Sequence, residues 1–255
     1  MASEATATAK SSRVRAYARL SLLLAWFAVC IGPHLVARLT GRSSWPRRFL
    51  GGVARIAGAD VRRHGPTPGA GHLILANHIS WLDIPVLAGA TGCAFVSKAE
   101  VRDHWLLRWF AEQNATIYVE RAERRAVHDQ AQSLRKGLES HQPLAVFPEG
   151  TVGNGRELLP FKPALLSAVA PPPDGVQVVP VAIDYHEHRE MIAWDTGKPG
   201  LQDFLRVLGR EASTRVTVRV LEPLEPHGDR KVIARAAAEA IRQALAASAS
   251  SRPAL

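Results

Sequence analysis

Short apolar runs alternate with helix-like stretches from about residue 60 onward, and this alternation restricts the possible fold more than any other feature. The strand-like runs lie at 72–77, 94–97, 115–119, 143–147, 176–183 and 215–224. Segments with helical periodicity lie at 81–90, 104–113, 125–140 and 161–170, and an alanine-rich helix is expected over 229–247. This order predicts an α/β fold with a largely parallel central sheet flanked by helices.

The N-terminal part of the chain carries a membrane signal. Three arginines precede an apolar run over 20–37, which Gly32, Pro33 and His34 interrupt. The run is at or below the roughly 17 to 25 apolar residues that a spanning helix needs, so it is expected to span marginally or to lie in one leaflet. A signal peptide is the alternative, although no small-residue cleavage site follows.

The next stretch, 45–58, mixes arginines with apolar residues such as Trp45, Phe49 and Ile56 at roughly helical spacing. This pattern predicts either an amphipathic helix at a membrane interface or an ordinary surface helix.

The net charge of +9 favours an anionic partner, such as nucleic acid, anionic lipid headgroups or a phosphorylated substrate. The arginines lie beside apolar residues and no aromatic-and-basic stacking motif is present, which favours lipid over nucleic acid. The two cysteines show no metal-binding spacing, so neither a disulfide framework nor a cysteine metal site is expected. The stretch YHEHR invites a metal interpretation through His186 and His188, but no third ligand is evident.

The stretch HISWLD, residues 78–83, lies where a strand leads into a helix. On a regular helix, five positions would separate His78 and Asp83 by about 140° around the axis. If His78 lies on the loop and Asp83 lies in the first turn, however, the carboxylate can reach the imidazole. Such a bond fixes the tautomer and leaves the other ring nitrogen as a general base. The alternative is that His78 merely caps the helix.

Further charged residues follow other predicted strands. FPEGT, residues 147–151, presents Glu149 after one strand, and Lys162 lies a short loop beyond Glu149. Arg121 follows another strand. Ligands tend to bind at the carboxyl ends of parallel strands, and the cations suit an anionic substrate. Taken singly, Arg121 could be a solvated charge and Glu149 could pair with Lys162.

NHISWLD, ATIYVER, FPEGT and VVPVAI resemble, in their order and approximate spacing, the four sequence blocks of the glycerolipid acyltransferase family, which includes the 1-acylglycerol-3-phosphate acyltransferases. The resemblance covers roughly residues 60–225, and the long gap after FPEGT is similar to bacterial members that include lyso-ornithine lipid acyltransferases. Two departures stand out. Ala115 stands where the second block commonly begins with glycine, and Val152 and Gly153 stand where the third often continues with Arg and Ser.

The resemblance implies an O-acyltransferase that moves a fatty acyl chain from acyl-CoA or acyl-ACP to the free hydroxyl of a lysolipid. The first expectation for the acceptor is 1-acylglycerol-3-phosphate, with lyso-ornithine lipid as the alternative. The implied catalytic residues are His78 and Asp83, and the implied substrate-binding residues are Asn77, Arg121, Glu149, Gly150, Thr151 and Lys162. The thioester is already activated, so no bound cofactor and no metal are expected, and the acyl-CoA or acyl-ACP is a co-substrate.

The resemblance also implies a division of the chain and a location. Residues 1–58 would form a membrane-anchoring or interfacial helical segment, 59–248 the acyltransferase catalytic domain and 249–255 a flexible tail. The expected place is the cytoplasmic face of the inner membrane, with an anionic membrane surface as partner and no nucleic acid. A catalytically silent lipid-binding protein and a hydrolase that passes the acyl group to water remain as rival functions.

Overall fold

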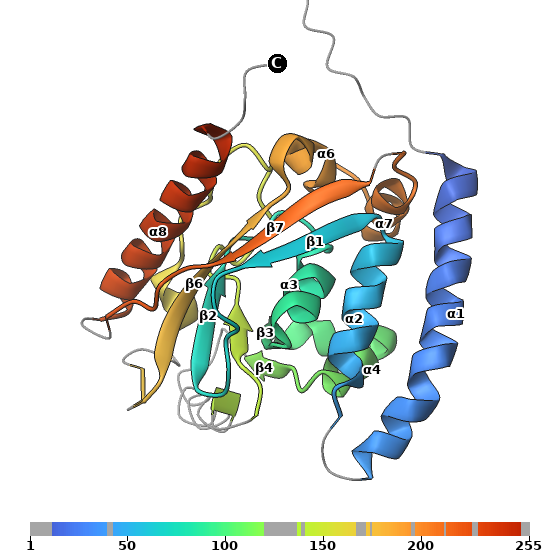
Figure 1. The fold of residues 1–255 in the computed structure, drawn as a ribbon, viewed down its shortest axis with the longest axis horizontal. Coiled ribbons are helices and arrows are strands. Elements are labelled where there is room, and N and C mark those ends of the chain that lie inside the picture. Colours follow the sequence, from blue (N-terminus) through green and yellow to red (C-terminus); the bar gives the residue numbers. More distant parts are fainter. Residues whose placement is uncertain are drawn as a thin grey trace, which may run out of the picture.

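A seven-stranded sheet, ordered β1-β7-β6-β2-β5-β3-β4, forms the centre of the protein in the computed structural model (Figure 1). The structure describes residues 12–39, 43–119, 137–138, 141–166, 172–173, 175–194, 197–211, 213–225 and 229–250. The strands are β1 (Ala59–His64), β2 (His72–Ala76), β3 (Ala94–Lys98), β4 (Ile117–Val119), β5 (Leu144–Val146), β6 (Gln177–Asp184) and β7 (Thr214–Val220). Neighbouring strands are parallel except for β6 and β7, which are antiparallel.

Helices cover both faces of this sheet. The α-helices are α1 (Arg13–Arg38), α2 (Trp45–Ile56), α3 (Asp83–Thr91), α4 (Trp105–Gln113), α6 (Arg189–Ile192), α7 (Gly200–Leu208) and α8 (Arg230–Ser250). Short 3-10 helices form η1 (Ala99–Asp103), η2 (Pro163–Leu166) and η3 (His186–His188). Figure 1 shows α8 at one side of the molecule and α1 with α2 at the other. The predicted α/β fold with its largely parallel sheet is therefore confirmed.

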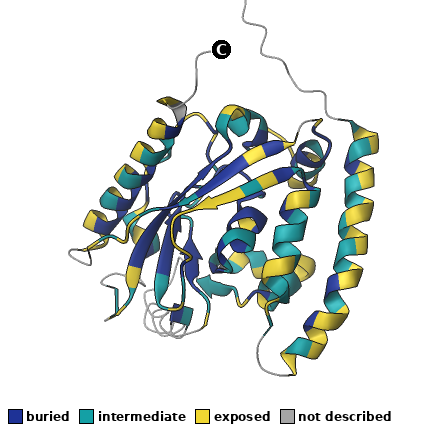
Figure 2. Cartoon of the chain, viewed as in Figure 1, coloured by how far each residue is buried: buried dark blue, intermediate teal, exposed yellow. Residues whose placement is uncertain are grey.

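The alternating side chains of β2 show how the two layers of core are built. Leu73 and Leu75 pack into the apolar cluster that contains Ile241 of α8, whereas Ile74 and Ala76 pack into the cluster on the other face. All of these positions are buried, and the sheet appears as a dark blue centre in Figure 2. A strand buried on both faces reads as a continuous apolar run, as 72–77 does.

The position of β2 decides where the loops after the strands meet. β2 pairs in parallel with β5 on one side and with β6 on the other. Parallel neighbours end at the same edge of a sheet, so the residues that follow these three strands come together there. Asn77 and His78 follow β2, Glu149 follows β5, and Tyr185 follows β6.

The helix α1 is continuous over 26 residues, and Pro33 lies inside it. Gly32, Pro33 and His34 therefore interrupt the apolar run of the sequence without breaking the helix. Among the described residues, α1 is the one helix that is long and apolar enough to cross a membrane.

The helix α2 is expected from its sequence and is present, and it packs closely against α3. A Cβ atom on Gly89 would lie 2.6 Å from the Cα of Gly51, so only glycine at position 89 permits this crossing. Ala54 and Ala57 belong to the same buried cluster as α3 residues. The N-terminal helices thus share the core of the sheet domain, and the division at residue 58 remains a prediction.

Ala115, which stands where the second block commonly has glycine, adopts a backbone conformation that favours glycine. The N–H of Ala115 donates to Glu112 O, and the N–H of Thr116 donates to Ala111 O, which closes α4 with a Schellman motif. Ala115 has a φ of 53°, in the left-handed region where glycine is favoured. Alanine in this region costs roughly 1 kcal/mol more than glycine. The usual glycine of the second block therefore corresponds to the residue that ends α4.

Several elements differ from the sequence-based expectation. β1 was not predicted, because only its first residue is fully buried and most of the strand ADVRRH is charged or polar. α7 was not predicted either. The helix expected over 161–170 is wrong in its described part, where Pro163–Leu166 forms a 3-10 turn. The helix expected over 125–140 lies outside the described residues except for 137–138, which are helical.

Candidate active site

His78 and Asp83 form a hydrogen bond at the edge of the sheet. The Nδ1 atom of His78 lies 2.8 Å from Oδ2 of Asp83, in the geometry that the spacing of HISWLD predicts. His78 lies on the loop after β2, and Asp83 is the first residue of α3. A carboxylate only accepts hydrogen bonds, so Nδ1 carries the proton of this bond, and in the neutral imidazole Nε2 carries the lone pair.

The carboxylate of Asp83 accepts four hydrogen bonds from the described residues. Besides His78, the backbone N–H groups of Ile79 and Ser80 donate to Oδ2 at 2.7 and 2.8 Å. The hydroxyl of Tyr185 donates to Oδ1 at 2.6 Å. Asp83 is fully buried, and these donors compensate its charge. Asp83, rather than His78, satisfies the N–H groups of the turn, which argues against a mere capping role for His78.

The imidazole of His78 is held flat and remains partly accessible. Its ring stacks on Phe147 with a centroid separation of 4.2 Å and an interplanar angle of 16°. The side chain is 16% exposed, and within the described residues Nε2 forms no hydrogen bond. Nε2 is therefore placed to accept a proton from a bound group.

The FPEGT segment holds the backbone of His78 on both sides. Oε1 of Glu149 accepts the N–H of His78 at 2.6 Å, and the N–H of Gly153 donates to the carbonyl of His78 at 2.8 Å. Oε2 of Glu149 accepts the N–H of Leu159 at 3.0 Å. The FPEGT motif therefore positions the loop that carries His78 of the HISWLD motif.

Comparison with protein families shows which family this chain belongs to. The Acyltransferase family matches residues 55–184, about half of the chain. The lyso-ornithine lipid O-acyltransferase of Pseudomonas aeruginosa is 35% identical over 252 residues, which cover 92% of this chain and 95% of that protein. The chain belongs to the Acyltransferase family.

Two further matches are a curated relative and a solved structure. The 1-acyl-sn-glycerol-3-phosphate acyltransferase of Neisseria gonorrhoeae is 31% identical over 130 residues, which cover 51% of this chain and 50% of that protein. The crystal structure of the 1-acyl-sn-glycerophosphate (LPA) acyltransferase PlsC from Thermotoga maritima matches with a TM-score of 0.61 and 22% identity. That match covers 94% of this chain and all of the PlsC chain, and it shows a shared fold.

The other predicted substrate-binding residues of the acyltransferase are placed differently from one another. Asn77 is buried and exchanges two hydrogen bonds with the backbone of Ile183. Gly150 has a φ of 68°, which the turn after Phe147 requires, and Thr151 is exposed. The binding roles of Asn77, Gly150 and Thr151 remain predictions.

Of the two predicted cations, Lys162 lies within the described residues. Lys162 is exposed, and it forms no ion pair with Glu149 or any other residue of the described ranges. Its backbone N–H donates to Pro148 O at 2.8 Å, which keeps it near the FPEGT turn. Arg121 lies outside the described residues, so its role also remains a prediction.

Sequence reasoning missed Tyr185 and the stacking partner Phe147. The motif YHEHR drew attention through its histidines, but its tyrosine contacts Asp83. His186 instead bonds to Thr217 through Nε2 at 2.9 Å, with Nδ1 3.3 Å from Asp184. The position of Tyr185 in the sequence could have identified it, because it directly follows β6, which lies beside β2 in the sheet.

The carboxyl group of Glu149 makes the stability of the acyltransferase sensitive to pH. Burial raises its pKa to about 7 from the ordinary 4.5, against the opposing effect of the N–H groups of His78 and Leu159. The folded protein therefore binds this proton more tightly than the unfolded chain. The resulting stabilisation is present at pH 4.5 and is lost as the pH rises through 7.

We expect the free energy of unfolding of the wild type, relative to Glu149→Gln, to fall by about 3 kcal/mol between pH 4.5 and 8. Urea denaturation of both proteins at a series of pH values measures this difference. The exposed Glu157→Gln variant is the control and should show no such trend. If the difference in the free energy of unfolding between the wild type and Glu149→Gln stayed constant with pH, the raised pKa of Glu149 would be contradicted.

Proposed function

We propose that this protein transfers a fatty acyl chain from a thioester to the hydroxyl of a lysolipid, with His78 as the general base. The observation that carries the proposal is the 2.8 Å bond from His78 to the buried Asp83, with Nε2 left open. Membership of the Acyltransferase family supports the same reaction.

The proposed reaction needs no covalent enzyme intermediate. Nε2 of His78 takes the proton of the lysolipid hydroxyl as its oxygen attacks the thioester carbonyl. The carbon–sulfur bond then breaks, and the thiolate leaves with the proton carried by the imidazolium. Asp83 stabilises the imidazolium between these two steps. Acyl-CoA or acyl-ACP would supply the thioester as a co-substrate.

The comparisons favour lyso-ornithine lipid as the acceptor over the 1-acylglycerol-3-phosphate expected from the motifs. The relatives from Pseudomonas aeruginosa and Rhizobium meliloti are both lyso-ornithine lipid O-acyltransferases and match over 95% and 74% of their lengths. A cavity of about 540 Å³ also borders Asn77 and Glu149. Its lining carries both cations and acids, among them Arg189 and Asp184. His78 does not line this cavity, so the proposed choice of acceptor rests on the relatives.

Transfer assays with purified protein would test this choice. The protein is given acyl-CoA or acyl-ACP with either lyso-ornithine lipid or 1-acylglycerol-3-phosphate, and the lipids are analysed by mass spectrometry. We expect faster acylation of lyso-ornithine lipid. Faster acylation of 1-acylglycerol-3-phosphate would reverse the order of the two acceptors. Consumption of neither thioester would favour a silent lipid-binding protein.

We further propose that α1 lies along the cytoplasmic surface of the inner membrane rather than crossing it. The outward-facing apolar side chains of α1 include Val14, Leu22, Leu24, Val29, Leu35 and Val36, and Figure 2 shows this helix largely exposed. On α4, Trp105, Leu106 and Leu107 are exposed as well. An exposed apolar surface of this kind marks a membrane or protein contact.

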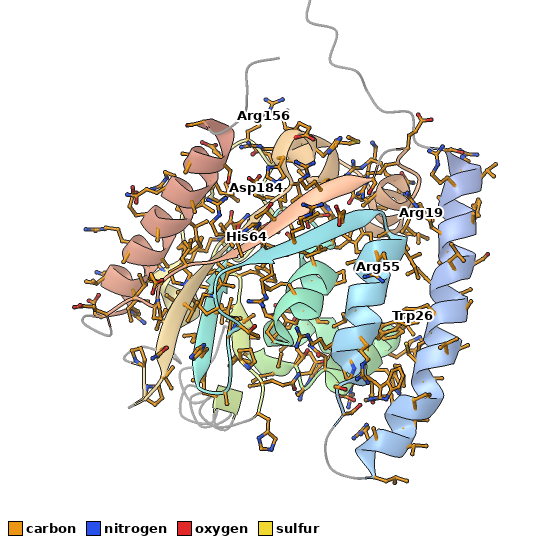
Figure 3. All side chains as sticks on the ribbon, viewed as in Figure 1. Arg19, Trp26, Arg55, His64, Arg156 and Asp184 are labelled. Atoms are coloured by element: carbon orange, nitrogen blue, oxygen red, sulfur yellow. The ribbon has the colours of Figure 1, made fainter. Side chains whose placement is uncertain are left out.

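Contacts at both ends of α1 support this orientation. Near the start of α1, Arg19 donates to the carbonyl of Leu208, the last residue of α7, and to that of Arg210. Near its end, His34 and Arg38 both bond to Gln113 of α4. Figure 3 shows Arg19 and Trp26 on the side of α1 that faces the body of the protein. A helix fixed along the domain in this way presents its outer face to a bilayer.

The apolar face of α1 is expected to make membrane binding resistant to salt. Replacing Leu22, Val29 and Val36 with Gln should leave mainly the arginines to bind anionic lipid, and salt screens such contacts. Flotation of both proteins with phosphatidylglycerol vesicles at low and high salt measures the effect. Salt should release the variant much more than the wild type. Equal release of the two proteins would count against the proposed orientation.

A further inference from the structure

Tyr185 contacts the proposed catalytic pair through the oxygen of Asp83 that does not bond to His78. It directly follows β6, it is 1% exposed, and its hydroxyl donates to Oδ1 of Asp83 at 2.6 Å. Among the described residues, it is the one group that donates to Oδ1. His78, Ile79 and Ser80 all donate to the other oxygen.

This division of donors matters for the orientation of the carboxylate. Three donors converge on Oδ2 and one on Oδ1, so the plane of the carboxylate is fixed only while both oxygens are engaged. Without the hydroxyl of Tyr185, Oδ1 would be a buried acceptor with no partner, at a position that is 0% exposed. A buried oxygen in that state carries a desolvation penalty, and the carboxylate gains freedom to rotate.

The surroundings of Tyr185 keep its proton on the phenol. Burial and the charge of Asp83 raise the pKa of Tyr185 well above its ordinary value, although nearby Arg210 acts in the opposite direction. Arg210 is itself buried and donates to Ala57 O at 2.9 Å. Burial lowers the pKa of Arg210 to about 10, so it remains charged at neutral pH beside the Tyr185–Asp83 pair.

We propose that Tyr185 is a positioning residue for acyl transfer, whose hydroxyl fixes the carboxylate of Asp83 and thereby the tautomer and angle of the His78 ring. This inference rests on the proposed function, since it assigns a role within the same site. Tyr185 contacts neither His78 nor the open Nε2 atom through any hydrogen bond in the described residues. It acts only through Asp83.

The test is Tyr185→Phe, which removes one oxygen and keeps the buried ring. We expect kcat/KM to fall roughly 10- to 30-fold, through kcat, with the KM for the lysolipid unchanged. The acid limb of the pH–rate profile should move to higher pH, because a carboxylate with one donor fewer stabilises the imidazolium more strongly. The control is Tyr17→Phe on α1, where the side chain is 57% exposed.

The pH profile also depends on the other charged groups around the pair. Glu149 faces the backbone of His78, and Arg210 lies beside Tyr185. Neither is altered in Tyr185→Phe, so a shift between the two profiles reports the lost hydroxyl. A fall in kcat with an unmoved profile would indicate a merely structural role and would overturn the proposal. So would wild-type kinetics in Tyr185→Phe.

A second readout does not depend on activity. The proton on Nδ1 of His78 is expected to give a downfield NMR resonance, assigned by its loss in His78→Asn. In Tyr185→Phe this resonance should move, because the carboxylate that accepts this proton is no longer fixed by the hydroxyl of Tyr185. An unmoved resonance would refute the positioning role. If the wild type transferred acyl groups to no acceptor while the resonance moved, the proposed function would fail and the coupling of Tyr185 to His78 would stand.

Discussion

The His78→Ala variant is expected to lose roughly 10²- to 10⁴-fold in kcat, the contribution of a positioned general base. Nε2 of His78 is the proposed proton acceptor, and no other described group bonds to Asp83 in a way that could replace it. The ring is stacked on Phe147 rather than enclosed in the core, so the loss of the side chain should leave the fold intact. Steady-state kinetics with the preferred acceptor measure the loss.

The control for this variant is His64→Ala, which removes an exposed histidine at the end of β1. Its activity should equal that of the wild type, and both variants should bind vesicles normally. If His78→Ala kept more than a tenth of the wild-type activity, the assignment of His78 as the base would be wrong.

The Asp83→Asn variant is expected to lose about 10³-fold or more in kcat and also to be less stable. The amide carries no charge to stabilise the imidazolium, and it weakens the hydrogen bonds from Ile79 and Ser80 that shape the turn. Replacing a charged acceptor with a neutral one should lower the free energy of unfolding by about 2 kcal/mol. Kinetics and urea denaturation of the same preparation measure both effects.

Measuring both the activity and the stability of Asp83→Asn distinguishes a catalytic role of Asp83 from a structural one. Asp60→Asn is the control, because Asp60 lies on β1 with an exposed side chain and only a long contact to Arg62. Loss of stability with nearly normal activity would mean that Asp83 only shapes the turn. Normal stability with lost activity would confine it to the reaction.

The central part of the fold could be predicted because its signals are local. Buried parallel strands such as β2 read as apolar runs, and a loop-to-helix transition after β2 brings His78 and Asp83 into reach. β1 escaped prediction because it pairs only with β7 and is mostly exposed and polar. Its place in the sheet depends on a partner more than 150 residues away, which no local pattern reveals.

The supporting contacts of the site were harder to predict than the site itself. Tyr185 reaches Asp83 from the end of β6 and Glu149 reaches the backbone of His78 from the loop after β5, so both bonds depend on the strand order. The N-terminal helices show the same limitation. The apolar run of α1 is visible in the sequence, but its attachment by Arg19 to carbonyls at and just after the end of α7 follows only from the packed structure.

The stoichiometry of the reaction tests most directly whether His78 and Asp83 serve acyl transfer to a lipid hydroxyl. Purified protein is mixed with acyl thioester and lysolipid, and free thiol and acylated lipid are counted in the same sample. If His78 is the general base, we expect one thiol for each acylated lipid in the wild type and negligible amounts of both in His78→Ala. Thiol released without acylated lipid, or equal product from both proteins, would contradict this expectation.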